Sequence, residues 1–157
     1  DVAELVQEGI EAHQAAAEDG GLTFVTEVAP DLPTIYGDSG SLSRALNALL
    51  DNAVKFSPDG GEVVVRVHAP EDEVHIEIQD PGVGFPMDKL AELFKPFTRI
   101  ESVDGHLFGG VGLGLPIAQH LVEVLHRGSI KAVSERGEGS TFTMTLPATE
   151  TPLKEEG

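Results

Sequence analysis

The chain has 157 residues, of which 40% are hydrophobic, and this composition is typical of one globular domain. It contains no cysteine, which excludes disulfides, zinc–thiolate sites and thiol chemistry. The formal net charge of −17 disfavours nucleic acid as a partner, so an anionic ligand would need local help from helix N-termini, backbone amides, a few basic side chains or a metal ion.

The first part of the sequence predicts two helices separated by one strand. Apolar residues recur at helical spacing from Val2 to about Asp19, and alternation over Leu22–Val28 indicates a strand. A second helix is expected to begin at a cap, either Asp38 or Ser41, and to run to about Phe56.

The middle of the chain predicts a hairpin and then an irregular region. Residues 62–68 and 73–79 alternate in polarity and are joined by the turn Pro70-Glu71-Asp72. A short helix is expected near residues 87–94. Residues 98–108 show no period, and a segment of this length is typical of a lid.

The last part predicts a third main helix over residues 113–126 and two strands over residues 129–134 and 140–146. Because helices interleave with antiparallel hairpins, we expect an α+β two-layer sandwich and not a doubly wound sheet. Residues 1–147 form the expected domain, and residues 148–157 an expected disordered tail.

The segment "LLDNAVKFSPDGG" combines a core stripe with polar residues on a second helix face. The stripe has spacings of three and four: Leu42, Leu46, Leu49, Ala53 and Phe56. Asn52 and Lys55 lie one turn apart on the second face, which they share with Arg44 and Ala48. An amide oxygen suits Mg²⁺, and an ammonium suits phosphate. The alternative is a solvated helix face, which is the commoner meaning of such a pair alone.

The segment "IQDPGVGF" places a carboxylate at the end of a strand. Asp80 continues the phase of the apolar residues in 74–78, so its side chain is expected on the buried face, where it needs a donor. The exocyclic amine of adenine is a fitting donor, and Gly82 and Gly84 allow backbone to approach a ligand. The alternative is an Asx-type turn at the strand end.

The segment "GGVGLGLPIAQH" places Gly110, Gly112 and Gly114 just before a helix, where exposed amides suit an anion such as phosphate. Neither common phosphate fingerprint is present, because the segment lacks GxxxxGK[ST] and does not follow a strand with GxGxxG spacing. The alternative is a flexible loop with a helix cap.

The order of these motifs resembles the ATP-binding catalytic domain of bacterial sensor histidine kinases, within the GHKL superfamily. The segment "NAVKFSPDGG" is similar to the N box, "DPGVGF" to the first glycine box, "LFKPFTRI" to the F box, and "GGVGLGLPIAQHLVE" to the second glycine box. The closing strand "GEGSTFTMTLP" also matches, so the resemblance covers residues 2–147. It implies the Bergerat fold, with a mixed, mostly antiparallel sheet packed on three main helices.

The resemblance implies a role for each matching residue of the N box and the first glycine box. Asn52 would be the Mg²⁺ ligand, and Lys55 would contact phosphate; these two are the implied catalytic residues. Phe56 would lie beside the nucleotide. Asp80 would accept from the adenine amine, with Gly82 and Gly84 shaping that pocket.

The later boxes imply further ATP contacts. The glycines of the second box would wrap the phosphates at the hinge of a lid, and the implied contacts there are Gly110, Gly112, Leu113 and Gly114. Arg99 follows the F box and could reach phosphate. Ser140 faces inward in the closing strand and would assist around the base through water.

The N box departs from the family pattern at Ala48, where many members carry a second Asn. Asn47 is one residue away from Ala48, and its side chain is expected on a different face of the helix. Pro81 and Val111 also replace more usual polar residues in the two glycine boxes. Hydrolysing relatives place a Glu at the position of Ala48 as general base, and alanine cannot activate water. The resemblance therefore implies a domain that holds ATP for transfer.

No histidine fits the phosphoacceptor motif of the family. His13 lies in "EAHQAAAEDG", which does not match, and the other five histidines match no better and lack metal-ligand spacing. We therefore expect a catalytic domain separated from its substrate histidine. The implied partners are a helical dimerisation domain of the same kinase and a downstream response regulator.

The resemblance implies a protein-histidine kinase, a transferase of two-component signal transduction that supplies the γ-phosphoryl of Mg-ATP to a phosphoprotein partner. Two alternatives stay open: a nucleotide-binding but catalytically degenerate regulatory domain, and an anti-sigma-type serine kinase of the same fold. Ala48 disfavours a gyrase-class ATPase. No apolar run in this sequence could span a bilayer, so we expect no direct membrane contact from it. The expected location is the cytoplasm, and a membrane anchor elsewhere in the full-length protein stays open.

Overall fold

A computed structural model describes most of the chain. The described residues are 2–30, 32–33, 35, 38–55, 57, 60–71, 73–82, 100–101, 107–108, 114–123, 127–135 and 137–148. The helix expected near residues 87–94 and the tail after residue 148 lie outside them.

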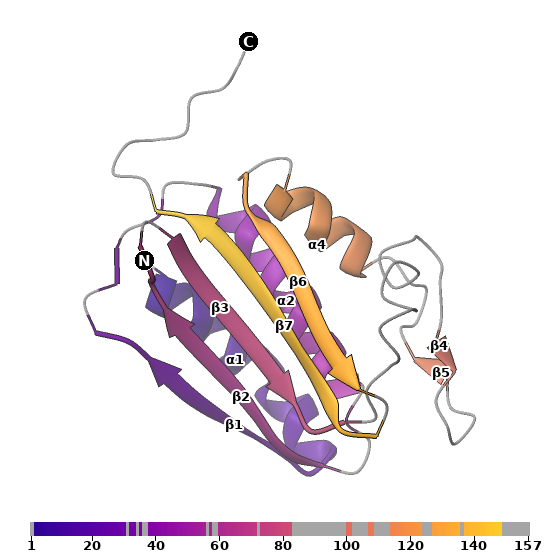
Figure 1. Ribbon diagram of the computed structural model, residues 1–157. Coiled ribbons are helices and arrows are strands. Elements are labelled where there is room, and N and C mark those ends of the chain that lie inside the picture. Colours follow the sequence, from indigo (N-terminus) through magenta and orange to yellow (C-terminus); the bar gives the residue numbers. More distant parts are fainter. Residues whose placement is uncertain are drawn as a thin grey trace.

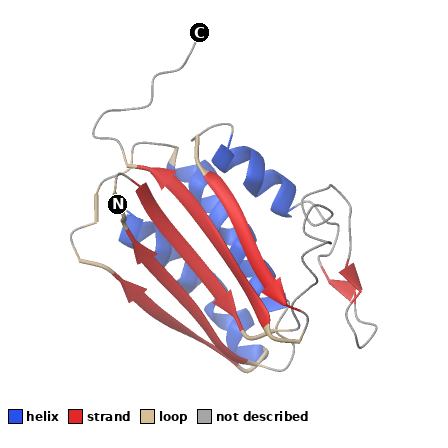
Figure 2. Ribbon diagram, viewed as in Figure 1, coloured by secondary structure: helices blue, strands red, loops and turns tan. Residues whose placement is uncertain are grey.

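The described elements form two layers, with helices on one face of a five-stranded sheet (Figure 1 and Figure 2). The helices are α1 (Val2–Asp19), α2 (Ser39–Lys55) and α4 (Gly114–Glu123). The strands of the main sheet are β1 (Leu22–Val28), β2 (Gly61–His68), β3 (Glu73–Asp80), β6 (Ser129–Glu135) and β7 (Gly139–Pro147). This architecture confirms the predicted α+β two-layer sandwich.

The sheet is mixed and has the strand order β1-β2-β3-β7-β6. The first pair, β1 and β2, is parallel because α2 carries the chain back across the sheet between them. The other three pairs are antiparallel, and β2–β3 and β6–β7 are hairpins. The β3–β7 register places Asp80 directly opposite Ser140.

One prediction for the region between β3 and β6 needs correction. Residues 98–108 were expected to lack regular structure, yet β4 (Ile100–Glu101) and β5 (Leu107–Phe108) pair as a small antiparallel sheet. Strands of two residues are too short to produce a periodic signal. The third main helix, expected over residues 113–126, is present as α4 over Gly114–Glu123, and residues 113 and 124–126 lie outside the described ones.

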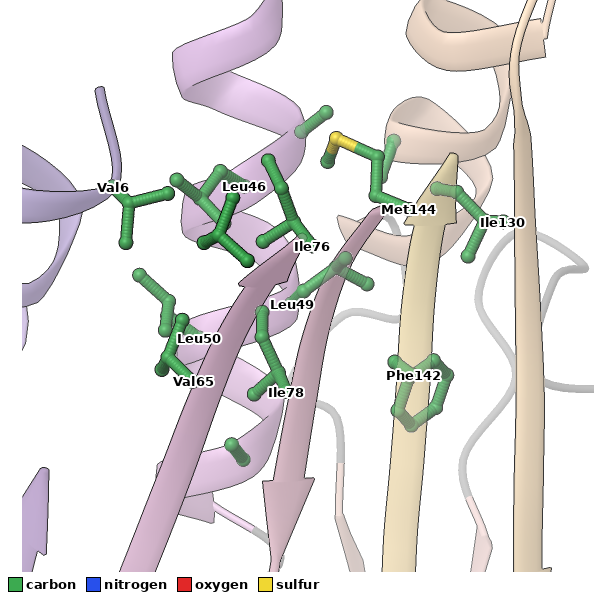
Figure 3. Packing of buried hydrophobic residues seen from close by; sticks show 14 of the residues in the cluster. Val6, Leu46, Leu49, Leu50, Val65, Ile76, Ile78, Ile130, Phe142 and Met144 are labelled. Carbon is green, nitrogen blue, oxygen red and sulfur yellow. The ribbon is translucent and has the colours of Figure 1, made fainter. Parts of the chain in front are cut away.

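The core lies between α2 and the inner face of the sheet (Figure 3). Alternation buries every second residue of β3 and β7, so that Ile76, Ile78, Phe142 and Met144 face the helices. On α2 the predicted stripe is confirmed at its four described positions: Leu42, Leu46, Leu49 and Ala53. Phe56, its fifth member, lies outside the described residues.

The start of α2 is fixed by Asp38. Its Oδ2 accepts hydrogen bonds from the backbone N–H and the hydroxyl of Ser41, which is the geometry of an N-cap. Of the two expected caps, Asp38 is therefore the one used. Among the helices that the structure describes, none is long and apolar enough to cross a membrane.

Candidate functional site

Asp80 ends β3 on the buried face of the sheet, as its phase predicts. Its side chain is only 2% exposed, although it is a carboxylic acid. Its Oδ1 accepts a hydrogen bond from the backbone N–H of Gly82 at 2.9 Å, so the Asx-type turn considered as the alternative is present. Its Oδ2 is buried and has no hydrogen-bond partner among the described residues. The turn therefore provides a hydrogen bond for only one of the two carboxylate oxygens.

Ser57 lies beside this carboxylate. Its side chain is 1% exposed, and its Oγ also lacks a hydrogen-bond partner in the described part of the chain. The hydroxyl is near enough to favour the charged form of Asp80, yet the two groups do not have hydrogen-bond geometry. Two buried polar atoms thus stand unpaired next to each other, which is rare in proteins.

Burial raises the pKa of Asp80 from 3.8 to about 6. The loss of hydration is the dominant cause, and it is opposed by the backbone N–H groups of Gly82 and Ser140 and by the Ser57 hydroxyl. At neutral pH the carboxylate is therefore mostly ionised and can only accept hydrogen bonds. A ligand that supplies an N–H donor would match it.

Glycines let other backbone segments close around Asp80. Gly139 has a φ of +106°, and a Cβ there would lie 2.2 Å from the carbonyl oxygen of Asp80. Gly61 has a φ of +120°, and a Cβ there would lie 2.9 Å from Cγ of Pro81. The turn after α2 and the start of β7 thus both approach the end of β3 at positions that only glycine permits.

Ser140 lies in the same neighbourhood, opposite Asp80 on β7, and is buried. Its Oγ lies 2.9 Å from Oγ of Ser134, which also donates to the carbonyl oxygen of Gly139 at 2.9 Å. A hollow of about 250 Å³ is lined by this serine pair and Asp80. The Ser140 hydroxyl is therefore already hydrogen-bonded, unlike that of Ser57.

On the face of α2 that carries Asn52 and Lys55, the first side chain is buried and the second is exposed to solvent. Asn52 is 8% exposed, so a solvated helix face does not describe it. Lys55 is exposed and forms an ion pair with Asp51, with Nζ and Oδ2 2.8 Å apart. Ala48 is partly buried and packs against the core. The ammonium of Lys55 must leave Asp51 if it is to reach a phosphate.

Asn47 does not replace the missing asparagine at position 48. Its Nδ2 donates to Oγ of Ser43 at 3.4 Å, and its Oδ1 is buried and unpaired within the described residues. A Cβ on Gly9 of α1 would lie 3.6 Å from that Oδ1, so Asn47 faces α1. The prediction that Asn47 points to another face is confirmed.

The structure brings together part of the predicted site. Asp80, Gly82 and Ser140 meet at the end of β3, and Gly114 begins α4, which packs against α2. The remaining predicted residues lie outside the described ones: Phe56, Gly84, Arg99, Gly110, Gly112 and Leu113.

Two residues at this place were not predicted from the sequence. Ser57 and Gly139 were quoted only within longer segments, "NAVKFSPDGG" and "GEGSTFTMTLP", and neither was given a role at the site. The sequence offered one signal for them: Asp80 was expected on the buried face of its strand. A buried carboxylate needs polar groups from neighbouring chain segments close to it.

The sequence is similar to a known protein family and to several histidine kinases. A family model described as "Histidine kinase-, DNA gyrase B-, and HSP90-like ATPase" matches residues 37–150. The sensor-like histidine kinase SenX3 of Mycolicibacterium smegmatis is 35% identical over 147 residues, which cover 94% of this chain and 38% of SenX3. The adaptive-response sensory kinase SasA of Synechococcus elongatus is 40% identical over 125 residues, which cover 79% of this chain and 32% of SasA.

The fold is also similar to solved structures of histidine kinases. The mycobacterial sensor histidine kinase MprB superposes with a TM-score of 0.80 at 29% identity, covering 94% of each chain. Full-length ShkA, solved in complex with AMPPNP, superposes with a TM-score of 0.81 at 29% identity, covering 98% of this chain and 32% of ShkA. The chain thus spans about a third of the length of SenX3 and SasA.

Proposed function

The chain belongs to the histidine kinase-, DNA gyrase B- and HSP90-like ATPase family, and we propose that it is the Mg-ATP-binding catalytic domain of a sensor histidine kinase. In this role it supplies the γ-phosphoryl group of ATP to a histidine on a separate dimerisation domain. The relatives reported above are named sensory or histidine kinases, so neither a degenerate domain nor a serine kinase is favoured.

The observation that carries this proposal is the buried oxygen of Asp80 that has no hydrogen-bond partner among the residues that the structure describes. A carboxylate of this kind loses hydration on burial and is retained where a ligand supplies the missing donor. The exocyclic amine of adenine is such a donor, and the glycines around Asp80 let neighbouring backbone approach the end of β3 closely. Asp80 is therefore the proposed base-recognition residue, with Gly82 and Ser140 beside it.

The residues present fit a magnesium ion held mainly by the nucleotide. No group of three histidine, aspartate or glutamate side chains in the described part could hold a metal. Mg²⁺ usually binds proteins through one or two oxygens and fills its octahedron with phosphates and water. The amide of Asn52 can supply one such oxygen. When bound, the ion would neutralise charge on the phosphates and orient them.

Transfer needs no nucleophile from this chain. An imidazole nitrogen of the acceptor histidine would attack the γ-phosphorus, the bond to the bridging β-phosphate oxygen would break, and ADP would leave. The chain would contribute position and charge: Asp80 holds the base, Asn52 the metal side of the triphosphate, and Lys55 a positive charge. Ala48 offers no base, so transfer to water should be slow.

Partners follow from the same proposal. SenX3 and SasA are longer than this chain, which leaves room in such proteins for a helical domain that bears the phosphoacceptor histidine. We propose that domain as the direct substrate, a response regulator as the downstream partner, and the cytoplasm as the location. The proposed remaining site residues are those in the undescribed segments: Phe56, Gly84, Arg99, Gly110, Gly112 and Leu113, with Gly114 at the start of α4.

Calorimetry with Mg-ATP tests the binding half of the proposal. The parent chain should bind Mg-ATP, and Asn52→Ala should weaken binding at least tenfold when Mg²⁺ is present but much less in excess chelator. Thr143→Ala, on the outer face of β7, is a matched control that should leave binding unchanged. A parent chain that binds no nucleotide at millimolar concentration would refute the proposed function.

A phosphotransfer assay tests the second half. A helical domain with a phosphoacceptor histidine, taken from SasA, is added in trans with γ-labelled ATP, and label on that domain is measured. Transfer that depends on both the acceptor histidine and Asn52 supports the kinase. Binding of ATP without transfer to any of several such domains would instead support the degenerate alternative.

A further inference from the structure

The pair formed by Ser57 and Asp80 has more capacity for hydrogen bonds than the described residues use. Ser57 Oγ and Asp80 Oδ2 are both buried, and neither has a hydrogen-bond partner among the described residues. The ionised carboxylate can only accept, whereas the hydroxyl can donate as well as accept. The two atoms together offer one acceptor and one donor at the same place.

Ser57 is fixed in this position by its backbone. Its N–H donates to the carbonyl of Val54 at 3.3 Å, and its own carbonyl accepts from the N–H of Gly60 at 3.2 Å. The turn is then tied to the connection between α1 and β1 by Gly61, whose N–H donates to the carbonyl of Gly21 at 3.2 Å. A hydroxyl held by such a turn is pre-positioned, so a ligand that uses it pays little ordering cost.

The pairing edge of adenine has the complementary pattern. Its exocyclic amine N6 donates, and the adjacent ring nitrogen N1 accepts. We propose that Ser57 is a specificity-determining residue that donates to N1 of adenine, directly or through one bridging water, while Asp80 accepts from N6. The inference rests on the proposed function, because it presupposes that ATP binds at Asp80.

Within this pair, Asp80 would reject guanine. Guanine presents a carbonyl oxygen where adenine has its amine, and an N–H where adenine has N1. The carbonyl oxygen would meet the acceptor Asp80, and both of these acceptors would remain unpaired, although the Ser57 hydroxyl could accept from the guanine N–H. Sites that require a hydrogen bond discriminate strongly against analogues that cannot form it. Both oxygens are covered by protein atoms, so the base must displace that cover when it binds.

A simpler role for Ser57 is to support Asp80, since its hydroxyl favours the charged carboxylate. The two roles predict different dependence on the base. If Ser57 only supports Asp80, its loss weakens every adenine nucleotide to the same degree. If Ser57 reads N1, its loss matters only for bases that have a nitrogen at that position.

The experiment combines Ser57→Ala with 1-deaza-ATP, in which N1 is replaced by carbon. Affinities of the parent and the variant are measured calorimetrically for ATP and for 1-deaza-ATP. For ATP, Ser57→Ala should weaken binding about tenfold, and 1-deaza-ATP should bind the parent about tenfold more weakly than ATP does. Ser57→Ala should then change the affinity for 1-deaza-ATP by less than about twofold, because no partner remains to be lost.

Controls separate this inference from the proposed function and from misfolding. Thr143→Val removes a hydroxyl on the opposite face of the sheet and should affect neither nucleotide. Ser57→Thr keeps a hydroxyl and should retain the preference for ATP over 1-deaza-ATP, and thermal melts establish that each variant is folded. Equal losses for both nucleotides in Ser57→Ala overturn the inference and leave the proposed function intact. A parent that binds no ATP overturns both.

Discussion

Asp80 carries a stability cost at neutral pH that its proposed role explains. In the unfolded chain the carboxyl titrates near 3.8, and in the folded chain near 6. The folded state therefore holds the proton more tightly, so the contribution of Asp80 to stability is fully present below pH 3.8 and is lost as pH rises through about 6. At pH 8 the buried charge costs up to about 3 kcal/mol.

Replacing this carboxylate should therefore stabilise the fold and abolish base recognition. Asp80→Asn keeps an acceptor for the Gly82 N–H but removes the buried charge. Its free energy of unfolding at pH 8 should exceed that of the parent by up to about 3 kcal/mol, falling to about half of that at pH 5. Urea unfolding at both pH values measures this difference, and calorimetry should show loss of ATP binding.

Glu77→Gln provides the matched control, because Glu77 lies on the same strand but on the outer face. Its stability should stay within about 0.5 kcal/mol of the parent at both pH values. If Asp80→Asn were destabilising at pH 8, or if its gain did not shrink towards pH 5, burial of an ionised Asp80 would be the wrong description.

Lys55 presents a different case, because its charge is already engaged by Asp51. Both side chains are nearly half exposed, so the pair should add less than about 1 kcal/mol to stability. Asp51→Asn should therefore leave the melting temperature almost unchanged but release the ammonium for phosphate. Affinity for Mg-ATP at low salt should rise about two- to threefold, as measured by calorimetry.

The control for this effect is Glu8→Gln on α1, which changes the net charge by the same amount on another helix. It should raise ATP affinity by less than Asp51→Asn does. Equal gains in the two variants would mean that only the overall charge matters and that Lys55 has no special access to phosphate.

Among the elements, the hairpin of β6 and β7 positions the site through one glycine. Gly139 has a left-handed φ, and a Cβ there would lie 2.2 Å from the carbonyl oxygen of Asp80. Gly139→Ala should therefore cost both backbone strain and a displaced strand end, about 2–4 kcal/mol in urea unfolding, and should weaken ATP binding.

Gly137, two residues earlier in the same turn, is the matched comparison. Its φ is +86°, but a Cβ there would meet nothing within 4 Å. Gly137→Ala should cost only about 1 kcal/mol and leave ATP affinity unchanged. If the two variants were equally destabilised, the contact between Gly139 and Asp80 would not be what distinguishes them.

Sequence periodicity predicted the long elements because burial on one face imposes it. The limits of α1 and β1 were predicted to the residue, and Asp80 was placed on the buried face by its phase alone. Ser57 was not recognised, because a serine in a turn is usually exposed and its burial depends on how that turn packs against β3. The strands β4 and β5 were missed because two residues carry no period.

At the scale of the whole molecule, the charge of −17 opposes both the compact state and an anionic nucleotide. Local groups at the site must therefore work against a repulsive field that salt can screen. Between about 20 and 500 mM NaCl the Debye length falls from roughly 20 Å to about 4 Å. Self-repulsion should weaken over this range, because acidic side chains outnumber basic ones by 27 to 10.

The melting temperature at pH 7 should therefore rise by several degrees over that range of salt, as measured by circular dichroism. Near pH 4.5, the isoelectric point expected from the sequence, the net charge vanishes and the same salt should shift it little. Equal shifts at both pH values would point to general exclusion of salt from the protein surface. A fall at pH 7 would mean that ion pairs such as Lys55–Asp51 outweigh the repulsion, which their exposure makes unexpected.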